Sequence, residues 1–173
     1  KMVQIGKLIN ENKLMGSDKI WWDIYKYPFI SWEWRVHTLP EGADESNDLV
    51  NDSAAGLYVV FQRSRVPVVD WQRQPADWIK YVWSSTLPVG TVVRQNVTKY
   101  GITLYNGRYV VIASGKKDLK KWITNKRNVL ADYQSCFGKA PRYHPSMLGI
   151  VTDSNSTATT AMADYDNIIA LTD

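Results

Sequence analysis

The sequence contains very little cysteine and histidine. Cys136 is the single cysteine among 173 residues, which excludes an internal disulfide bond, and histidine occurs only twice. A structural zinc site uses four cysteine or histidine ligands, so these residues cannot supply a standard one. We therefore predict a fold held together by its apolar core, without cross-links.

Long apolar runs are also absent. No stretch approaches the roughly 20 apolar residues of a membrane-spanning helix, so the chain is not predicted to be transmembrane. With 45% hydrophobic and 22% charged residues, the composition excludes a disordered or collagen-like chain. The length suits one well-packed core, so we expect residues 1–173 to form a single domain.

Phenylalanine is scarce, whereas tryptophan and tyrosine are abundant. Three Phe stand against eight Trp and ten Tyr. A core that needs only apolar bulk could use Phe, which has no buried N–H or O–H group to satisfy. The ratio therefore predicts that some Trp and Tyr rings lie at the surface.

The positive charge is concentrated in one segment. The formal net charge is +4, yet Lys116 to Arg127 alone contains six basic residues and one acidic residue. A protein that neutralises many phosphates usually carries a broader basic stripe, so nucleic acid is not a predicted partner. We interpret the lysines of this segment as a solvated exterior.

Strand patterns dominate the chain. Trp32, Trp34 and Val36 alternate with Glu33, Arg35 and His37, which predicts a half-buried strand. Similar patterns predict further strands, and Asn106-Gly107 between apolar runs predicts a hairpin turn. The other expected strands cover residues 54–62, 78–84, 90–96, 101–105, 108–113, 147–152 and 161–171.

One segment instead has the 3.6-residue period of a helix. Its apolar residues share one helical face, Ser114 is the expected N-cap, and Gly138 followed by Pro141 is the expected end. The residues of that face are Leu119, Trp122, Ile123, Leu130, Tyr133 and Phe137. Many short strands and one amphipathic helix together predict a mainly β fold, an antiparallel jelly-roll β-sandwich with the helix at an end or edge.

Several short motifs also occur in a fixed order. They include Ser-Trp-Glu-Trp-Arg-Val at 31–36, Leu-Pro-x-Gly-Ala-Asp at 39–44, Asn-Asp-Ser-Ala-Ala at 51–55, Tyr-Val-Trp-Ser at 81–84 and Thr-Asp-Ser at 152–154. With these motifs the chain resembles the DUF3047 family of uncharacterised bacterial proteins over roughly residues 31–168. The resemblance implies a jelly-roll sandwich of the galactose-binding or concanavalin type and a periplasmic or secreted location. It implies no catalytic residue, because the family has no settled activity.

The aromatic residues suggest a ligand. Trp and Tyr faces pack against the C–H surfaces of sugars, and a neighbouring carboxylate and guanidinium can orient hydroxyl groups or an anionic sugar. We predict a non-catalytic carbohydrate-binding or cell-envelope recognition module whose partner is an oligo- or polysaccharide. The predicted ligand-binding residues are Glu33, Arg35, Tyr58, Trp78, Lys80, Tyr81 and Trp83.

Other interpretations stay open. Glycoside hydrolysis needs two carboxylates about 5 to 10 Å apart, and only Glu33 is suitably placed. A polysaccharide lyase could use Arg35, His37 and Tyr58 for neutralisation and proton transfer. Alternatively, Trp32 and Trp34 are core residues, the polar face of their strand is a solvated ion-pair surface, and the domain binds a protein partner.

A calcium ion is the one cofactor that the sequence leaves open. Asp44, Asp48 and Asp52, together with Asp164 and Asp166, could supply oxygen ligands, although their spacing does not match an EF-hand. We prefer the alternative that Asp52 and Asp153 cap turns. No cofactor is therefore predicted, and the oligomeric state is not determined by the sequence.

Overall fold

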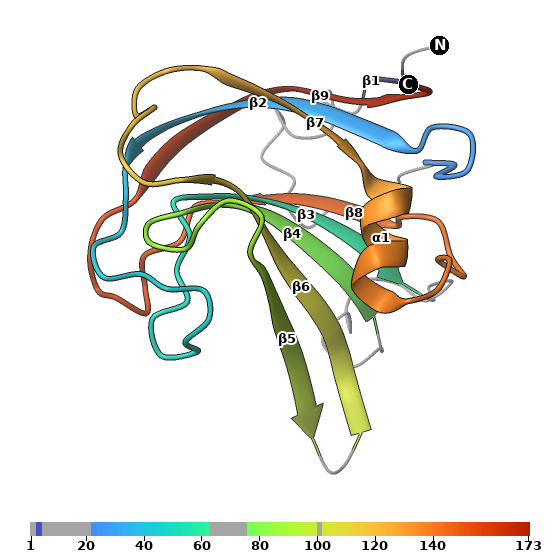
Figure 1. Ribbon diagram of the computed structural model, residues 1–173, viewed down its shortest axis with the longest axis horizontal. Helices are drawn as coiled ribbons and strands as arrows, with labels where there is room; N and C mark the ends of the chain where they lie inside the picture. Colours follow the sequence, from blue (N-terminus) through green and yellow to red (C-terminus); the bar gives the residue numbers. More distant parts are fainter. Residues whose placement is uncertain (1–2, 5–21, 63–75, 100–101) are drawn as a thin grey trace.

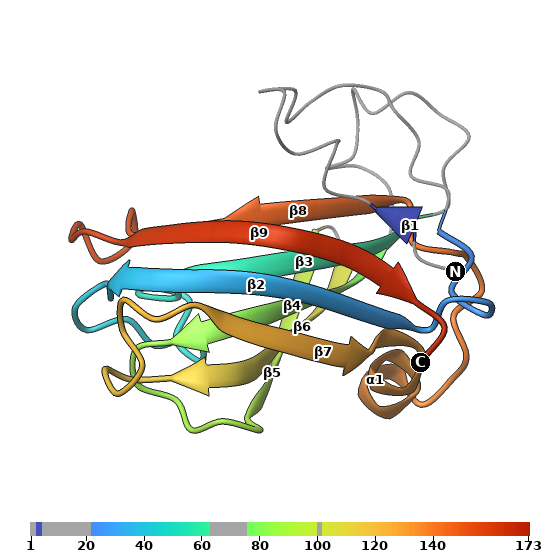
Figure 2. The ribbon, with the colours of Figure 1, turned by 90° about the horizontal axis from the view of Figure 1, so that it is seen from above.

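In the computed structural model, the described residues 3–4, 22–62, 76–99 and 102–173 form two facing β-sheets and one short helix (Figure 1). Figure 2 looks down on sheet A, with sheet B behind it. The strand order of sheet A is β1 (Val3–Gln4), β9 (Met162–Leu171), β2 (Phe29–Thr38) and β7 (Ile123–Asn128). The order of sheet B is β5 (Val92–Lys99), β6 (Ile102–Ser114), β4 (Ala76–Ser84), β3 (Ala55–Gln62) and β8 (Met147–Val151). The predicted mainly β, sandwich-like fold is confirmed, and the jelly-roll connectivity stays a prediction.

Strand β2 lies between β9 and β7 and shows how the sequence pattern places the core. Trp32, Trp34 and Val36 are fully buried, whereas the residues between them are only half-buried. Because side chains alternate between the two faces of a strand, one face of β2 points at sheet B. The predicted half-buried strand is confirmed.

Aromatic rings from both sheets meet in the centre of the molecule. Trp32 and Tyr81 have ring centroids 5.4 Å apart, and those of Trp34 and Trp83 are 6.1 Å apart. Each such ring removes about 150–250 Å² from water, worth several kcal/mol at roughly 25 cal/mol per Å². The interpretation of Trp32 and Trp34 as core residues is confirmed.

The helix α1 (Val129–Phe137) begins later than the sequence pattern predicts. The segment Ile123–Asn128 is strand β7, which pairs with β2 along the edge of sheet A. Ile123 is its one apolar residue, so the segment itself carries little of the helical pattern, and pairing with β2 satisfies its backbone groups. The predicted helix over residues 119–128 is therefore wrong.

Both ends of α1 have ordinary capping chemistry. The Asn128 side chain accepts a hydrogen bond from the N–H of Ala131, so Asn128 is the N-cap, and the prediction of Ser114 is wrong. Gly138 has φ 69°, in the left-handed region that favours glycine, and ends the helix as predicted. Only the end of the helix could be located from local sequence.

The predicted hairpin turn at Asn106-Gly107 is also wrong. Strand β6 continues through both residues from Ile102 to Ser114. A Cβ atom at Gly107 would lie 2.0 Å from Cζ2 of Trp78, so glycine is needed there for close packing, not for a turn.

One strand pair corrects the prediction of a fully antiparallel fold. β4 and β6 pair in parallel, whereas the other pairs described here are antiparallel. The reason is that β5 follows β4 in the chain but pairs on the far side of β6. The antiparallel β5–β6 hairpin thus brings β6 back beside β4 in the same direction.

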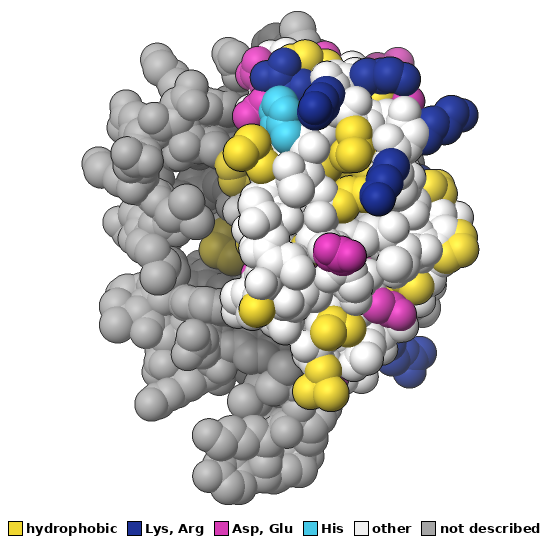
Figure 3. Space-filling view, turned by 90° about the vertical axis from the view of Figure 1, so that its left-hand side faces the viewer, with side chains coloured by type: hydrophobic (Ala, Val, Ile, Leu, Met, Phe, Trp, Pro, Cys, Tyr) yellow, Lys and Arg dark blue, Asp and Glu magenta, His cyan; other side chains and the backbone are white. Residues whose placement is uncertain are grey.

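The basic segment before β7 lies at one end of the sandwich. Lys116, Lys117, Lys120 and Lys121 are exposed, and the view of this end in Figure 3 shows Lys and Arg side chains gathered in its upper part. Their exposure agrees with the interpretation of a solvated exterior. In the described part of the chain, no helix is long and apolar enough to cross a membrane.

Candidate functional site

The seven predicted ligand-binding residues do not share one surface. The structure divides them among the outer face of sheet A, the core between the sheets and the outer face of sheet B. The respective groups are Glu33 and Arg35, then Tyr81 and Trp83, and finally Tyr58, Trp78 and Lys80.

Tyr81 and Trp83 are core residues, so the expectation that they line an open face is corrected. Their exposed fractions are 0% and 1%, because the alternation along β4 turns them toward sheet A. The hydroxyl of Tyr81 donates to Asp132 at 2.8 Å, and the indole of Trp83 donates to the carbonyl of Gly115 at 3.1 Å. Each polar group has thus found a partner without reaching solvent.

The outer face of sheet A carries a cross-strand polar network. Arg35 Nη2 and His37 Nε2 lie 2.5 and 2.8 Å from the same Oδ2 atom of Asp164, and Glu33 accepts a hydrogen bond from Thr124. Hydrogen bonds from His37 and then Arg35 lower the pKa of Asp164. The guanidinium of Arg35 also stacks on the exposed Trp122, 4.7 Å from the ring centroid. This arrangement agrees with the ion-pair alternative for Glu33 and Arg35.

The outer face of sheet B contains a row of three side chains. Tyr58 of β3, Lys80 of β4 and Tyr109 of β6 are register partners on adjacent strands. The ammonium of Lys80 lies 5.3 Å from the ring centroid of Tyr58 and 5.0 Å from that of Tyr109, within the range of cation–π attraction. It also donates to Ser53 Oγ at 3.2 Å.

Trp78 extends this row into a larger aromatic group. Its ring centroid lies 5.2 Å from that of Tyr58 and 5.5 Å from that of Tyr109. Trp78 and Tyr58 are half-buried, whereas Lys80 is only 2% exposed. We call these four residues, Tyr58, Trp78, Lys80 and Tyr109, the sheet B platform.

Two glycines provide the space for the platform. Gly107 lies directly against the indole of Trp78, and a Cβ atom at Gly56 would lie 2.5 Å from Cε of Lys80. Because both positions lack a side chain, Trp78 and Lys80 can lie flat across the neighbouring strands. The sheet itself therefore fixes the orientation of the platform.

Acidic groups surround the ammonium of Lys80. Burial lowers the pKa of Lys80 to about 8, although Asp153, Glu45 and Asp52 oppose this change. Burial also raises the pKa of Glu45, which is fully buried; Oε2 accepts from Ser84 at 2.6 Å, and Oε1 has no hydrogen-bond partner among the described residues. A buried ammonium beside a buried carboxyl group is the kind of perturbed pair found at functional sites.

The phenols of the platform are held in their neutral form. Burial raises the pKa of Tyr58 to about 12, and it raises the pKa of Tyr109 further still. The hydrogen bond that the two phenols share favours protonated Tyr109. At neutral pH the platform thus contains two O–H groups and one ammonium, with Lys80 and Tyr109 both buried.

Sequence reasoning missed Tyr109 and Glu45. Tyr109 lies in a predicted strand, but its neighbours depend on the parallel pairing with β4, which has no local signal. Glu45 lies in an acidic loop, where nothing in the sequence separates a buried carboxyl group from exposed ones. Trp71, one of the eight tryptophans of the sequence, lies outside the described residues.

The acidic residues considered for calcium have protein partners. Asp52 accepts hydrogen bonds from the backbone N–H groups of Ser156 and Thr157, and Asp48 accepts from Gln95. Within the described ranges, no three His, Cys, Asp or Glu side chains are grouped so that they could hold a metal ion. Asp52 therefore caps a turn, although the turn is a distant one in sequence. These contacts do not test calcium binding, which the sequence leaves open without predicting it.

Comparison with known protein families gives a match. The model of a family described as "Protein of unknown function (DUF3047)" matches residues 14–169. The match begins earlier than the motifs that start at residue 31, and it covers nearly the whole chain. A search of curated proteins gives no match.

Proposed function

This chain belongs to the DUF3047 family, and from that premise we propose that it is a carbohydrate-recognition module whose binding surface is the sheet B platform. The proposal keeps Tyr58, Trp78 and Lys80 of the predicted residues and adds Tyr109. It assigns Glu33 and Arg35 to a surface network, and Tyr81 and Trp83 to the core.

One observation carries the proposal. Three aromatic rings and one ammonium gather on the outer side of sheet B, outside the apolar layer between the sheets. Tyr109 belongs to a second buried apolar cluster with Val82 and Val111, against which Trp78 packs. Lys80 adds a costly buried cation that apolar packing alone does not need. The ring of Trp78, held flat against Gly107, provides a stiff surface for the C–H face of a sugar.

The polar groups of the platform would orient the bound sugar through hydrogen bonds. Tyr58 and Trp78 are the half-buried members, so a ligand would touch their rings first. Lys80 is a positioning residue, because its ammonium holds the two phenols on either side of it. A periplasmic or secreted location is proposed with this function, since the family resemblance implies an exported protein.

The test measures retention of the protein on a glycan array and on insoluble polysaccharides. We expect Trp78→Ala to lower retention at least about tenfold, corresponding to about 1.4 kcal/mol. Tyr58→Phe, which keeps the ring and the fold, should lower it by a smaller factor. Trp122→Ala is the matched control, because it removes an exposed tryptophan from the outer face of sheet A.

Two outcomes contradict the proposal. One is that no glycan retains the unchanged protein. The other is that Trp122→Ala abolishes retention while Trp78→Ala does not, which moves the site to sheet A. Melting temperatures of all variants separate loss of binding from loss of folding.

The same panel tests an enzymatic alternative. The lowered pKa of Lys80, together with the hydrogen-bonded phenols of Tyr58 and Tyr109, would suit proton transfer during cleavage of a polysaccharide. New reducing ends that disappear in Tyr109→Phe would favour a lyase or hydrolase over a binding module.

A further inference from the structure

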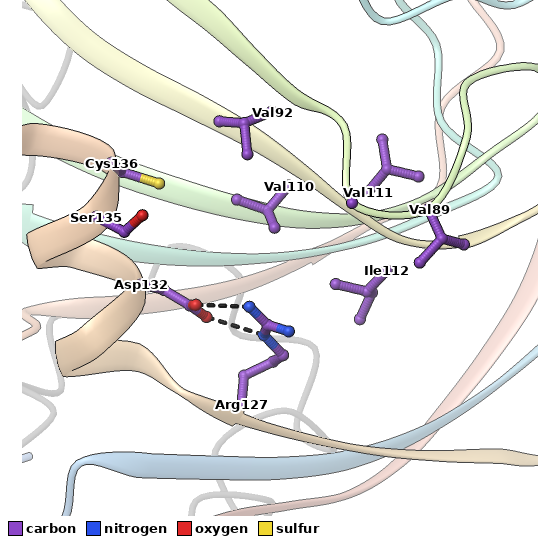
Figure 4. A pocket seen from close by; sticks show the side chains of 10 residues that line it. Val89, Val92, Val110, Val111, Ile112, Arg127, Asp132, Ser135 and Cys136 are labelled. Carbon is purple, nitrogen blue, oxygen red and sulfur yellow. Dashed lines mark hydrogen bonds and ion pairs between the residues drawn. The ribbon is translucent and has the colours of Figure 1, made fainter.

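A cavity of about 210 Å³ opens beside α1, between this helix and strands β5 and β6 (Figure 4). It lies apart from the sheet B platform, and none of the four platform residues lines it. Its two walls differ in chemistry, as Figure 4 shows.

The first wall is apolar. It consists of valine and isoleucine side chains from the loop before β5, from β5 itself and from β6, among them Val89, Val92, Val110 and Ile112. Val89 and Val92 are 63% and 52% exposed, so the apolar wall reaches solvent. An apolar group entering the cavity would therefore remove both its own surface and that of the valines from water.

The second wall carries a fixed ion pair. Arg127 donates from Nε and Nη2 to the two carboxylate oxygens of Asp132, at 2.9 and 2.5 Å. Asp132 also accepts a hydrogen bond from the hydroxyl of Tyr81, a core residue. Because Tyr81 is completely buried, the guanidinium is oriented before any ligand arrives.

The third nitrogen of this guanidinium, Nη1, donates no hydrogen bond to Asp132. Figure 4 shows this nitrogen on the side of Arg127 away from Asp132. Arg108 lies near enough to act on the cavity residue Cys136, and Arg94 acts on Arg108. Burial and Asp132 raise the pKa of the Cys136 thiol more than Arg108 and Arg127 lower it. An anion in the cavity therefore depends on a direct contact with Arg127.

From this arrangement we propose that the cavity binds a small carboxylate with an apolar body of about six carbons. The body packs on the valine wall, and the carboxylate accepts from Nη1 of Arg127. An apolar cavity of about 150 Å³ holds benzene, so the size suits a short chain or a single ring. This proposal does not depend on glycan binding at the platform.

The single cysteine of the chain provides a direct reporter. Cys136 lines the cavity and is half-buried, so alkylation of its thiol reports on this place alone. We use hexanoate as the probe, with hexan-1-ol and acetate as comparators, and follow alkylation by N-ethylmaleimide with mass spectrometry. At about 20 mM, hexanoate should slow alkylation at least about fivefold in a saturable manner. Hexan-1-ol and acetate should slow it less than about twofold.

Two variants and one control complete the experiment. Arg127→Gln removes the anion contact, and Val92→Trp fills the mouth of the cavity from an exposed position. Calorimetric titration with hexanoate should show binding weakened at least about tenfold in both variants. Lys126→Gln, on the neighbouring residue, removes a cation that lies over Phe29 and should leave binding unchanged.

Three results would overturn the proposal. They are absence of protection by hexanoate, equal protection by all three probes, and unchanged hexanoate binding in Val92→Trp. If Arg127→Gln fails to fold, Val92→Trp still tests the proposal, because Val92 is exposed and its replacement should not disturb folding.

Discussion

At the scale of single residues, the high Trp and Tyr content predicts rings at the surface, but several of these rings are buried in the core. Eight Trp and ten Tyr suggest surface rings, yet Tyr81 and Trp83 are buried with their polar atoms bonded to Asp132 and Gly115. A buried hydroxyl or indole N–H costs little once it has a partner. Polar anchoring thus accompanies the burial of Tyr81 and Trp83, whereas the indole N–H groups of Trp32 and Trp34 are buried without a hydrogen-bond partner among the described residues.

Lys80 gives the clearest prediction at this scale. Its pKa is about 8 in the folded protein and about 10.5 in the unfolded chain, so the unfolded chain holds more protons between these values. The free energy of unfolding should therefore rise with pH, by about 2 to 3 kcal/mol between pH 8 and pH 10. Above about pH 10, ionisation of the tyrosines in the unfolded chain opposes this rise.

Urea unfolding between pH 7.5 and 10 measures the effect. Lys80→Met should remove the rise, whereas Lys121→Met, at an exposed position, should retain it. Equal slopes in Lys80→Met and the unchanged protein would show that another group is responsible.

At the scale of elements, the segment before α1 shows how tertiary pairing overrides a local pattern. The apolar residues at 119–137 share one helical face, but β7 takes residues 123–128 because β2 offers an edge with unpaired backbone groups. The helix can begin only where this pairing ends, at Asn128. Its end at Gly138 needs no partner strand, and this end could be predicted from the sequence.

The N-cap is tested by substitution of Asn128. Asn128→Ala should lower the free energy of unfolding by about 1 kcal/mol, since the N–H of Ala131 loses its partner. Ser135→Ala, at an exposed position in the same helix, is the control and should change stability by less than about 0.5 kcal/mol. If both variants unfold at the same urea concentration as the unchanged protein, the cap contributes nothing.

At the scale of the whole molecule, the aromatic stack joins the two sheets. Trp32 and Trp34 come from sheet A, whereas Tyr81 and Trp83 come from sheet B, and all four are buried together. Neither sheet can keep these rings from water without the other. The two sheets should therefore unfold in one cooperative transition, as expected of the predicted single domain.

Trp83→Ala tests this coupling. It should cost about 3 to 5 kcal/mol, because a large ring is removed from a closed core. Far-ultraviolet and near-ultraviolet circular dichroism should give coincident unfolding curves for both the variant and the unchanged protein. Two separate transitions would show that the sheets are independent units.

Features with a local cause could be predicted from the amino-acid sequence alone. The two faces of β2 follow from alternation, and the end of α1 follows from the left-handed conformation of Gly138. Tertiary structure decided which strands become neighbours, and hence that Gly107 lies under Trp78 and that Lys80 lies between two phenols. The physical reason is that register and sheet order depend on contacts between residues far apart in the chain, for which no short segment carries a signal.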